Sequence, residues 1–416
     1  MLTMNYRYRI YPSFEQEARM VSWLEACRGV YNYALRERKD WIESRKSPAD
    51  RCSLERCFII PADAPYPDYY TQKRNLTAAK KELPHLKDVQ SQVLQDVLGR
   101  LDGAFASRKD RGHGFPRFKK FGQYRSFLFP QFQVSPIQGN EIKLPKIGLM
   151  PIVLHRPIPN GFVVKTVRVI RKASGWYATL CIQADLDIPD VPPTAGHAIG
   201  IDVGLSYFLS TSDGEQIARP RFFGKWQGKL ELLQRRLKGK QKRSNNTAKL
   251  RKKIGRVQEK IAACRLDWHF KLAHHLCDQA QLIFAEDLDF RIMAKGILGK
   301  HTLDAGLGQF LNQVLPWVCW KRGVYYAKVD PSGTSQTCPD CGARVRKDLS
   351  VRLHECHECG STKPRDVASG QVIKARGLSG IENVCGWDLS GAMPRQDRVK
   401  QKCLEVTQEA RVLSER

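Results

Sequence analysis

Apolar and polar residues alternate at the start of the chain as they do in a strand, over residues 6–11. Ser13 followed by Gln16 is typical of a capping box at the start of a helix. Apolar residues then recur at helical spacing to about residue 45: Met20, Leu24, Cys27, Tyr31 and Leu35. A second helix is expected after Asn75 and a third after Pro84. The first part of the chain therefore predicts a helical module of about 100 residues.

The segment 108–120 interleaves basic side chains with Phe115 and Phe118 around glycines and a proline, so a helix is not expected to persist there. Cations suit phosphates, and aromatic rings suit unstacked bases. This composition favours contact with nucleic acid, through Arg117, Lys119 and Lys120 among others. A solvated basic loop held by two buried rings is the alternative interpretation.

Short alternating runs separated by glycine and proline occupy residues 126–188 and predict a small β-barrel or sandwich. The strand at 6–11 is expected to join it, which would make the helical module an insertion between strands. Pro189, Pro192 and Pro193 mark a linker.

The pattern after the linker differs. An apolar strand at 197–203 contains Asp202, and a second strand is expected at 205–211. Residues 224–260 hold 14 Lys and Arg against two acidic residues and predict a long basic helical hairpin, either a solvated charged face or a phosphate-binding one.

A helix from about residue 261 then leads into the apolar strand 281–286, which ends on Glu286. A helix is predicted at 306–322 and a strand at 323–329. Beyond residue 380 the apolar periodicity is lost, and a mobile tail is expected over 381–416.

The composition and the net charge of the chain indicate the size of its fold and the class of its binding partner. The 416 residues are 42% hydrophobic, enough for two or three packed domains. The 69 Lys and Arg against 42 Asp and Glu give a net charge of +27, which indicates a polyanionic partner such as DNA or RNA. No apolar run is long enough for a membrane span and the N-terminus does not resemble a signal peptide, so we expect no membrane association and a cytoplasmic location, at the nucleoid when bound to DNA.

Four of the 13 cysteines have a meaningful spacing. Cys338 and Cys341 form one CxxC pair, and Cys356 and Cys359 form another after 14 residues. Two such knuckles predict a zinc ribbon, a closed four-sulfur site that is structural rather than catalytic. Two redox-active pairs are the alternative, but the βαβ context that they need is not indicated. His354 and His357 could compete as ligands, although neighbouring or solvent-facing positions are expected for them.

Three carboxylates stand at positions that suggest a chemical role. Asp202 lies within a predicted strand, Glu286 ends another, and Asp366 follows the ribbon. An acid inside an apolar strand is costly unless a cation compensates it. Two Mg²⁺ ions held by shared carboxylates would do so, and such a pair hydrolyses phosphodiesters. A very basic protein with these acids is interpreted as a metal-dependent nuclease.

The chain resembles the transposon-encoded TnpB family of RNA-guided DNA endonucleases, which are related to type V CRISPR effectors. The resemblance covers roughly residues 6–378. Its motifs stand at 114–120 (GFPRFKK), 142–148 (IKLPKIG), 200–204 (GIDVG), 285–288 (AEDL) and 334–342 (TSQTCPDCG).

This resemblance implies a multidomain α+β fold. A wedge β-barrel would comprise residues 1–12 and 126–190, with an inserted helical recognition module at 13–125. An RNase H-like α/β nuclease domain of the RuvC type would comprise 196–330 and 364–380, interrupted by the four-cysteine zinc ribbon at 331–363.

The resemblance also implies that Asp202, Glu286 and Asp366 are the catalytic, magnesium-binding acids. It suggests that Ser91, Gln92 and Gln95 on the third helix help read a short motif beside the target. The family's third acidic motif usually reads Asp-Arg-Asp, any residue, then Asn-Ala-Ala. This chain has the run 364–370 (PRDVASG), so the preceding Asp and the following Asn are lost. Pro364 is expected just ahead of a helix that starts near Asp366.

The leading hypothesis is therefore a Mg²⁺-dependent endonuclease that binds a guide RNA, acts on single- and double-stranded target DNA, and is monomeric in the complex. A cleavage-impaired DNA-binding protein of the same lineage, a compact type V CRISPR effector and a transposase are the alternatives. The altered third motif favours the first of these alternatives, and the retained acids argue against it.

Overall fold

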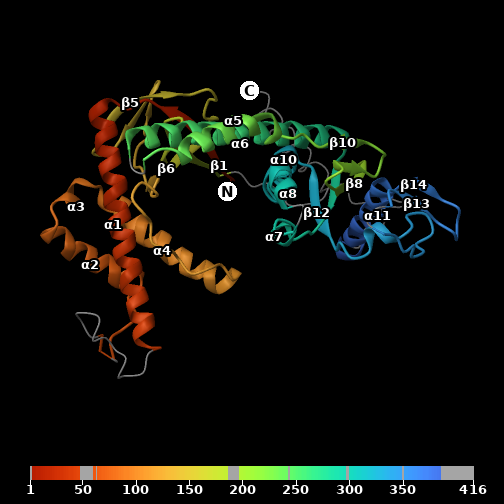
Figure 1. Ribbon diagram of the computed structural model, residues 1–416, viewed down its shortest axis with the longest axis horizontal. Coiled ribbons are helices and arrows are strands. Elements are labelled where there is room, and N and C mark those ends of the chain that lie inside the picture. The colour runs from red at the N-terminus through yellow and green to blue at the C-terminus, as the bar shows by residue number, and fades with distance from the viewer. Residues whose placement is uncertain are drawn as a thin grey trace. The chain divides into compact units, whose positions relative to one another are not determined.

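The computed structural model describes residues 2–46, 60–61, 63–185, 196–241, 244–296, 299–348 and 351–385. The chain divides into two compact units, Met1–Asp187 and Ile188–Arg416 (Figure 1). The expected linker prolines lie outside the described residues, as does the predicted tail from residue 386 onward. The last helix runs to Cys385, past the predicted boundary at 380.

The first unit contains one seven-stranded antiparallel sheet in the order β2-β6-β7-β1-β5-β4-β3. The first strand, β1 (Leu2–Ile10), lies between β7 and β5, far from its neighbours in sequence. The helices are therefore inserted between β1 and β2, as predicted. The end strands β2 and β3 are not paired with each other, so this sheet is open rather than a closed barrel. The remaining strands are β2 (Ser126–Phe129), β3 (Ile137–Gln138), β4 (Glu141–Leu144), β5 (Gly148–Val153), β6 (Val163–Arg171) and β7 (Trp176–Ala184).

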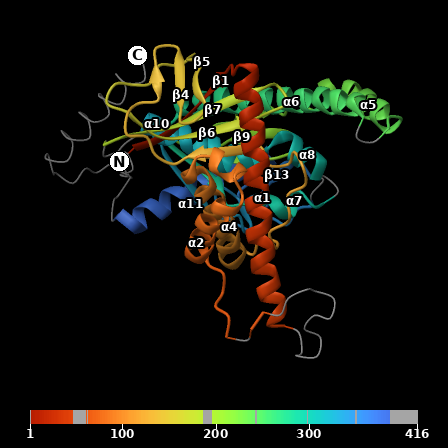
Figure 2. The same ribbon diagram turned by 90° about the vertical axis from the view of Figure 1, so that its left-hand side faces the viewer.

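The inserted helices begin with α1 (Phe14–Ser44), whose predicted capping box of Ser13 and Gln16 is present. The second helix, α2 (Tyr69–Glu82), begins before Asn75 rather than after it, because the Asp68 side chain accepts a hydrogen bond from the Thr71 amide and caps the helix earlier. A short helix, α3 (His85–Asp88), precedes α4 (Ser91–Arg111). Figure 2 shows α1 as the longest helix of this group.

A five-stranded mixed sheet forms the second unit, in the order β10-β9-β8-β11-β12. β8 (Ala198–Val203) runs parallel to β11 (Leu282–Glu286), which runs parallel to β12 (Tyr325–Val329). β9 (Tyr207–Thr211) is antiparallel to β8, and β10 (Gln216–Ala218) is antiparallel to β9. The predicted strands at both acidic positions are therefore present and adjacent.

Helices pack on this sheet and form a long hairpin beside it. The hairpin consists of α5 (Gly224–Lys238) and α6 (Asn245–Gln279), whose facing apolar residues include Leu230 and Val257. The predicted break near residue 260 is wrong, because buried residues recur at helical spacing from Val257 through Ile261 into the core, and α6 is one helix of 35 residues. The hairpin is visible in Figure 2.

The remaining elements complete this unit. They are α7 (Phe290–Met293), α8 (Gly299–Ala305), α9 (Leu307–Gln309), a π-helical turn (Phe310–Val314), α10 (Leu315–Arg322), a 3₁₀ turn (Thr334–Gln336), β13 (Leu353–Glu355), β14 (Thr362–Pro364) and α11 (Arg365–Cys385). In the part of the chain that the structure describes, no helix has the length and apolar character that crossing a membrane needs.

Candidate active site and metal-binding cluster

Asp202 and Glu286 lie level on adjacent parallel strands. The register pairs Ile201 of β8 with Ala285 of β11, so the next residue on each strand is an acid. In-register side chains on neighbouring strands point to the same face of a sheet. The two carboxylates therefore project from one face, at the carboxyl ends of β8 and β11.

Helix α11 covers that same face through a very close backbone contact. A Cβ atom placed on Gly200 would lie 2.0 Å from the Gly370 carbonyl oxygen and 2.5 Å from the Lys374 nitrogen. Gly200 is two residues before Asp202, so it shares the face of the two acids. Asp366 lies in the first turn of α11, four residues before Gly370 and hence on the same side of the helix. The start of the helix at Arg365, directly after Pro364, agrees with the prediction.

Electrostatic effects connect Asp202 with the other two acids. Burial, first, and then the nearby carboxylates of Glu286 and Asp366 together raise the pKa of Asp202 to about 8. The Ser369 hydroxyl and the Arg365 guanidinium act in the opposite direction. Like charges that share a site disfavour ionisation. Asp202 is thus close enough to Glu286 and Asp366, both distant in sequence, for their charges to raise its pKa.

Glu286 is 8% exposed, and its carboxylate is held by a hydrogen bond from Thr334. The Thr334 hydroxyl donates a hydrogen bond to the Glu286 carboxylate, and its oxygen lies 3.2 Å from the carbonyl oxygen of Pro331. Burial raises the pKa of Glu286, while Thr334 and the Arg376 guanidinium partly offset that rise. The side chain is therefore fixed in position and its charge is only partly balanced.

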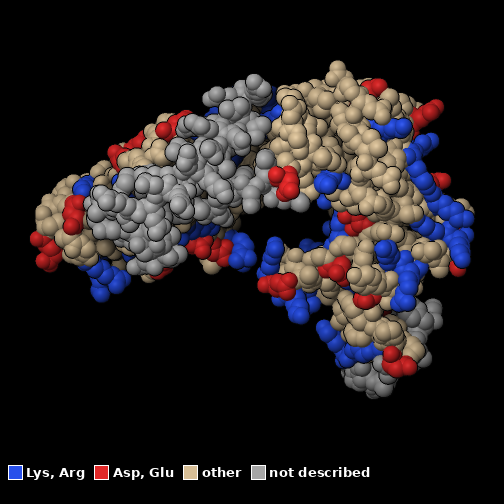
Figure 3. All heavy atoms as spheres, turned by 180° about the vertical axis from the view of Figure 1, so that it is seen from behind, with Lys and Arg blue, Asp and Glu red and all other residues tan. Residues whose placement is uncertain are grey.

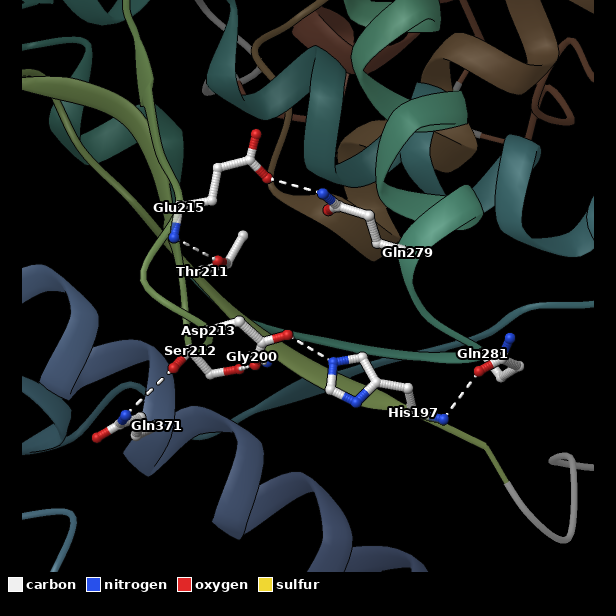
Figure 4. A network of polar contacts seen from close by, with 9 residues as sticks. All are labelled: His197, Gly200, Thr211, Ser212, Asp213, Glu215, Gln279, Gln281 and Gln371. Atoms are coloured by element: carbon white, nitrogen blue, oxygen red, sulfur yellow. Dashed lines mark hydrogen bonds and ion pairs between the residues drawn. The ribbon is translucent and has the colours of Figure 1, made fainter.

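A network of polar contacts fastens α11 to the strands under the site (Figure 4). Gln371 donates to the Ser212 carbonyl at 3.2 Å, and the Ser212 amide donates to the Gly200 carbonyl at 2.8 Å. Ser212 in turn donates to Asp213, which contacts the His197 ring at 2.5 Å. These bonds hold the close contact between Gly200 and Gly370, and so fix the first half of α11, which carries Asp366, against β8.

The donor set of this site suits a hard divalent cation, because it consists of carboxylate oxygens. The three carboxylates are less tightly gathered than a formed metal cluster. Among the described residues, only the four cysteines bring three or more potential ligand atoms of His, Cys, Asp or Glu within 4.8 Å of one another.

The four predicted zinc ligands, Cys338, Cys341, Cys356 and Cys359, do come together. The Sγ atoms of Cys338 and Cys359 lie 3.6 Å apart, as do those of Cys341 and Cys356. A disulfide needs about 2.05 Å. Tetrahedral zinc with bonds of about 2.3 Å requires sulfur atoms about 3.8 Å apart. The cluster therefore has the size of a zinc site and could hold that ion.

Both knuckles of this cluster have matching backbone bonds. The Gly342 amide donates to the Cys338 carbonyl at 3.0 Å, and the Gly360 amide donates to the Cys356 carbonyl at 2.9 Å. The Cys359 backbone amide lowers the pKa of Cys356 to about 7, which favours the thiolate that binds metal.

The two histidines considered as competing ligands lie outside the cluster. His354 is fully buried and contacts Lys347, and His357 is exposed. Neither histidine is among the residues whose ligand atoms converge.

The predicted nucleic-acid-binding residues all belong to the first unit. Arg117 and Lys120 are exposed, whereas Lys119 is half-buried with its Nζ 5.5 Å from the Tyr31 ring centre. At the start of α4, Ser91 accepts a hydrogen bond from Lys80 at 2.7 Å and Gln92 accepts one from Gln90 at 3.1 Å. Gln95 lies one turn further along and is half-buried.

Two residues of the acidic site had no predicted role. Thr334 lies in one of the motifs of the family resemblance, but no charge or periodicity connects it to Glu286, 48 residues away. Ser369 lies within the altered third acidic motif, and no feature of the sequence assigns it a role. Its position beside Asp202 depends on the docking of α11, which no local pattern encodes.

Three family models match segments of the chain. A model described as a probable transposase matches residues 181–296, one described as a helix-turn-helix domain matches 1–47, and one described as a Cas12f1-like TNB domain matches 309–373. In this chain, residues 2–46 form the strand β1 and the single long helix α1. The third match includes all four clustered cysteines.

Two curated relatives match almost the whole chain. A putative RNA-guided DNA endonuclease, InsQ, of Escherichia coli (strain K12) is 30% identical over 420 residues, covering 97% of this chain and 98% of the relative. A putative RNA-guided DNA endonuclease of Streptomyces pristinaespiralis is 30% identical over 414 residues, covering 97% and 95%.

Two solved structures of RNA-guided nucleases align with this chain at low sequence identity. A Cas12f1 complex with guide RNA and target DNA is 17% identical and aligns with a TM-score of 0.31 over 91% of this chain and all of that chain. The mini-RNA-guided endonuclease Cas-phi3 is 11% identical and aligns with a TM-score of 0.33 over 52% of both chains.

Proposed function

We propose that this chain, which belongs to the TnpB family of transposon-encoded proteins, is an RNA-guided DNA endonuclease. Both curated relatives carry that activity in their names and match the chain nearly end to end. The observation that carries the proposal to particular residues is the convergence of Asp202, Glu286 and Asp366 on one electrostatically coupled site.

The three acids would hold Mg²⁺, which supplies charge stabilisation and an activated water for phosphodiester hydrolysis. The fit rests on the donor set and on Asp202, whose pKa is raised to about 8 by burial and by the neighbouring carboxylates. Thr334 orients the Glu286 carboxylate, and Ser369 favours the ionised form of Asp202. We propose the RuvC type of RNase H-like core for this unit, supported by acids at the carboxyl ends of adjacent strands.

The partners proposed are a guide RNA and the target DNA, with one copy of the protein in the complex. The net charge of +27 supports a polyanion of this kind. Basic side chains are spread over the helical part of the first unit at the lower right of Figure 3. We propose that the helical module at 13–125 carries the groups that bind nucleic acid, with Arg117, Lys119 and Lys120 at phosphates and Ser91, Gln92 and Gln95 near the target-adjacent motif. A structural zinc ion would complete the ribbon.

A guided-cleavage assay tests this function. The full chain, co-purified with its own RNA, is given Mg²⁺ and a DNA that matches the guide and carries a randomised flank. We expect cleavage only beside a short flanking motif, and we expect a replaced guide sequence to redirect it. Cutting that ignores the guide would refute RNA guidance, and tight guided binding without cutting would support the cleavage-impaired alternative.

That alternative is favoured by one observation, the loss of the usual Asn in the third motif, where Ala368 stands. It is opposed by the retained Asp366 at its place in the first turn of α11. Action as a compact CRISPR effector or as a transposase would use the same acids. The guided assay separates strand transfer from simple hydrolysis through its products.

A further inference from the structure

A cavity of about 510 Å³ lies in the first unit between the end of α1 and the segment 115–118. One wall is a single face of the α1 region, with Lys39, Ile42, Glu43 and Lys46 at helical spacing. The other wall is the run from Phe115 to Phe118. Its volume is within the range of small-ligand sites and sufficient for one nucleotide.

Aromatic and cationic groups meet inside this cavity. The Lys39 ammonium lies 5.9 Å from the ring centre of Phe115 and 5.3 Å from that of Phe118. Arg108 lies 5.0 Å from the ring centre of Phe115. Lys46 and Arg117 also line the cavity. Three basic side chains and one carboxylate therefore lie around the two phenyl rings.

The loop wall is held in place before any ligand arrives. The Asn32 side chain donates to the Lys119 carbonyl at 2.9 Å and accepts from the Lys119 amide at 2.8 Å. Further along, the Gly122 amide donates to Glu25 at 3.1 Å. These bonds from α1 fix the backbone that carries both phenyl rings. A preorganised wall reduces the entropy lost on binding.

Phe118 is 45% exposed, although an apolar ring is more stable when it is buried. A flat aromatic surface beside several cations complements a nucleobase joined to phosphate, because the base stacks on the ring and the cations neutralise the phosphate. Bases within a duplex are already stacked and cannot enter such a cavity.

We infer that this cavity binds one unpaired nucleotide of a single-stranded nucleic acid, with its base on Phe118 and its phosphate beside Lys46 and Arg117. The inference rests on the proposed function, which supplies the nucleic acid, and it assigns a site outside the acidic centre. The strand is either the guide RNA or an unpaired DNA strand.

Equilibrium binding tests this site without any cleavage. The full chain, without added Mg²⁺ so that no strand is cut, is titrated with labelled single strands of about 12 nucleotides, one RNA and one DNA, and with a duplex of equal length. Phe118→Ala and Phe118→Leu should weaken single-strand binding roughly 5- to 150-fold, the loss expected from about 1–3 kcal/mol of stacking. Duplex binding should remain within about twofold, because electrostatic contacts dominate it. The strand that loses more affinity identifies the source of the nucleotide.

Phe121→Ala is the matched control, since Phe121 is a phenyl three residues away, is 81% exposed and does not line the cavity. It should change single-strand binding less than about twofold if stacking at Phe118 is specific. The Leu variant retains apolar volume, so a defect shared by Phe118→Leu and Phe118→Ala reports the ring rather than misfolding. Equal effects at Phe118 and Phe121, or equal losses for single strands and duplex, would overturn the inference. These readouts do not depend on cleavage, so failure of the nuclease proposal would be seen separately.

Discussion

Asp202 is the acid of the site on which burial and neighbouring charge act most strongly. In the unfolded chain its pKa would be near 3.8, whereas in the folded chain it is about 8. Between these values the folded protein retains a proton that the unfolded chain has lost. The stability that this proton provides is complete below about pH 4 and is lost as the pH rises to 8.

Asp202→Asn should therefore stabilise the protein when no Mg²⁺ is present. The amide is neutral at every pH, so the stability gained over wild type should grow from pH 4 to pH 8 and reach at least about 1.4 kcal/mol, one pKa unit. Thermal unfolding across this pH range measures it. Added Mg²⁺ should stabilise wild type but not the variant. A variant that is less stable than wild type at pH 8 would show that Asp202 has a structural role instead.

Ser369 affects the same ionisation from α11. It is 2% exposed and its hydroxyl lowers the pKa of Asp202, although the hydroxyl makes no hydrogen bond of ordinary geometry with any described residue. Ser369→Ala should raise the pKa further and shift the acidic limb of the cleavage–pH profile upward by about half a unit to one unit. The profile of Ser379→Ala, an exposed serine on the same helix, should remain unchanged. A downward shift in Ser369→Ala would contradict the assigned contact.

The acids themselves could be predicted from sequence, because a carboxylate inside or at the end of an apolar strand is visible in the pattern. The residues that influence the charge of these acids could not be predicted from sequence. Thr334 and Ser369 are uncharged and unremarkable in sequence, and each reaches its acid only after separate elements dock.

At the scale of elements, the close approach of α11 to β8 sets where Asp366 stands. Because an added methyl at Gly200 would strike backbone atoms of Gly370 and Lys374, Gly200→Ala should cost about 1–3 kcal/mol and reduce cleavage by displacing the helix. Gly228→Ala is the control, since Gly228 lies within α5 and an added methyl there meets nothing within 4 Å. Its stability should be equal or higher. Chemical denaturation followed by circular dichroism compares the two, and equal stability would contradict the close contact.

The four-cysteine cluster makes a separate prediction. Wild type should contain about one zinc ion per chain, and Cys356→Ser should lose most of it because three thiolates bind more weakly than four. Cys264→Ser should retain the metal, as this exposed cysteine lies outside the cluster. Elemental analysis counts the zinc, and limited proteolysis should show new cuts between residues 338 and 360 in the depleted variant. Full zinc content in Cys356→Ser would refute the site.

Periodicity predicted most elements of the sheets and helices, and it failed where a local cap or continued packing decided the outcome. Helix α2 begins at the Asp68 cap, earlier than its apolar pattern indicates, and α6 continues through residue 260 because the same stripe serves both the hairpin and the core. The first strand's place between β7 and β5 could be anticipated, but the open form of that sheet depends on pairing of distant strands.

At the scale of the whole molecule, the two compact units carry different chemistry. The first unit holds the basic and aromatic cavity, and the second holds the acids and the cysteines. A net charge of +27 provides affinity for nucleic acid without sequence preference, so specificity must come from another source. Base pairing with a guide RNA would supply it.

The most direct test compares guided cleavage by wild type with that by Asp202→Asn, Glu286→Gln and Asp366→Asn, each purified with the same RNA. At equal occupancy of a matched target in Mg²⁺, wild type should cut, and each variant should bind within about twofold but cut at least about 100-fold more slowly, as expected when a metal-binding acid is lost. Cleavage by any variant at the wild-type rate, or by wild type in EDTA, would contradict the proposed role of the acidic site.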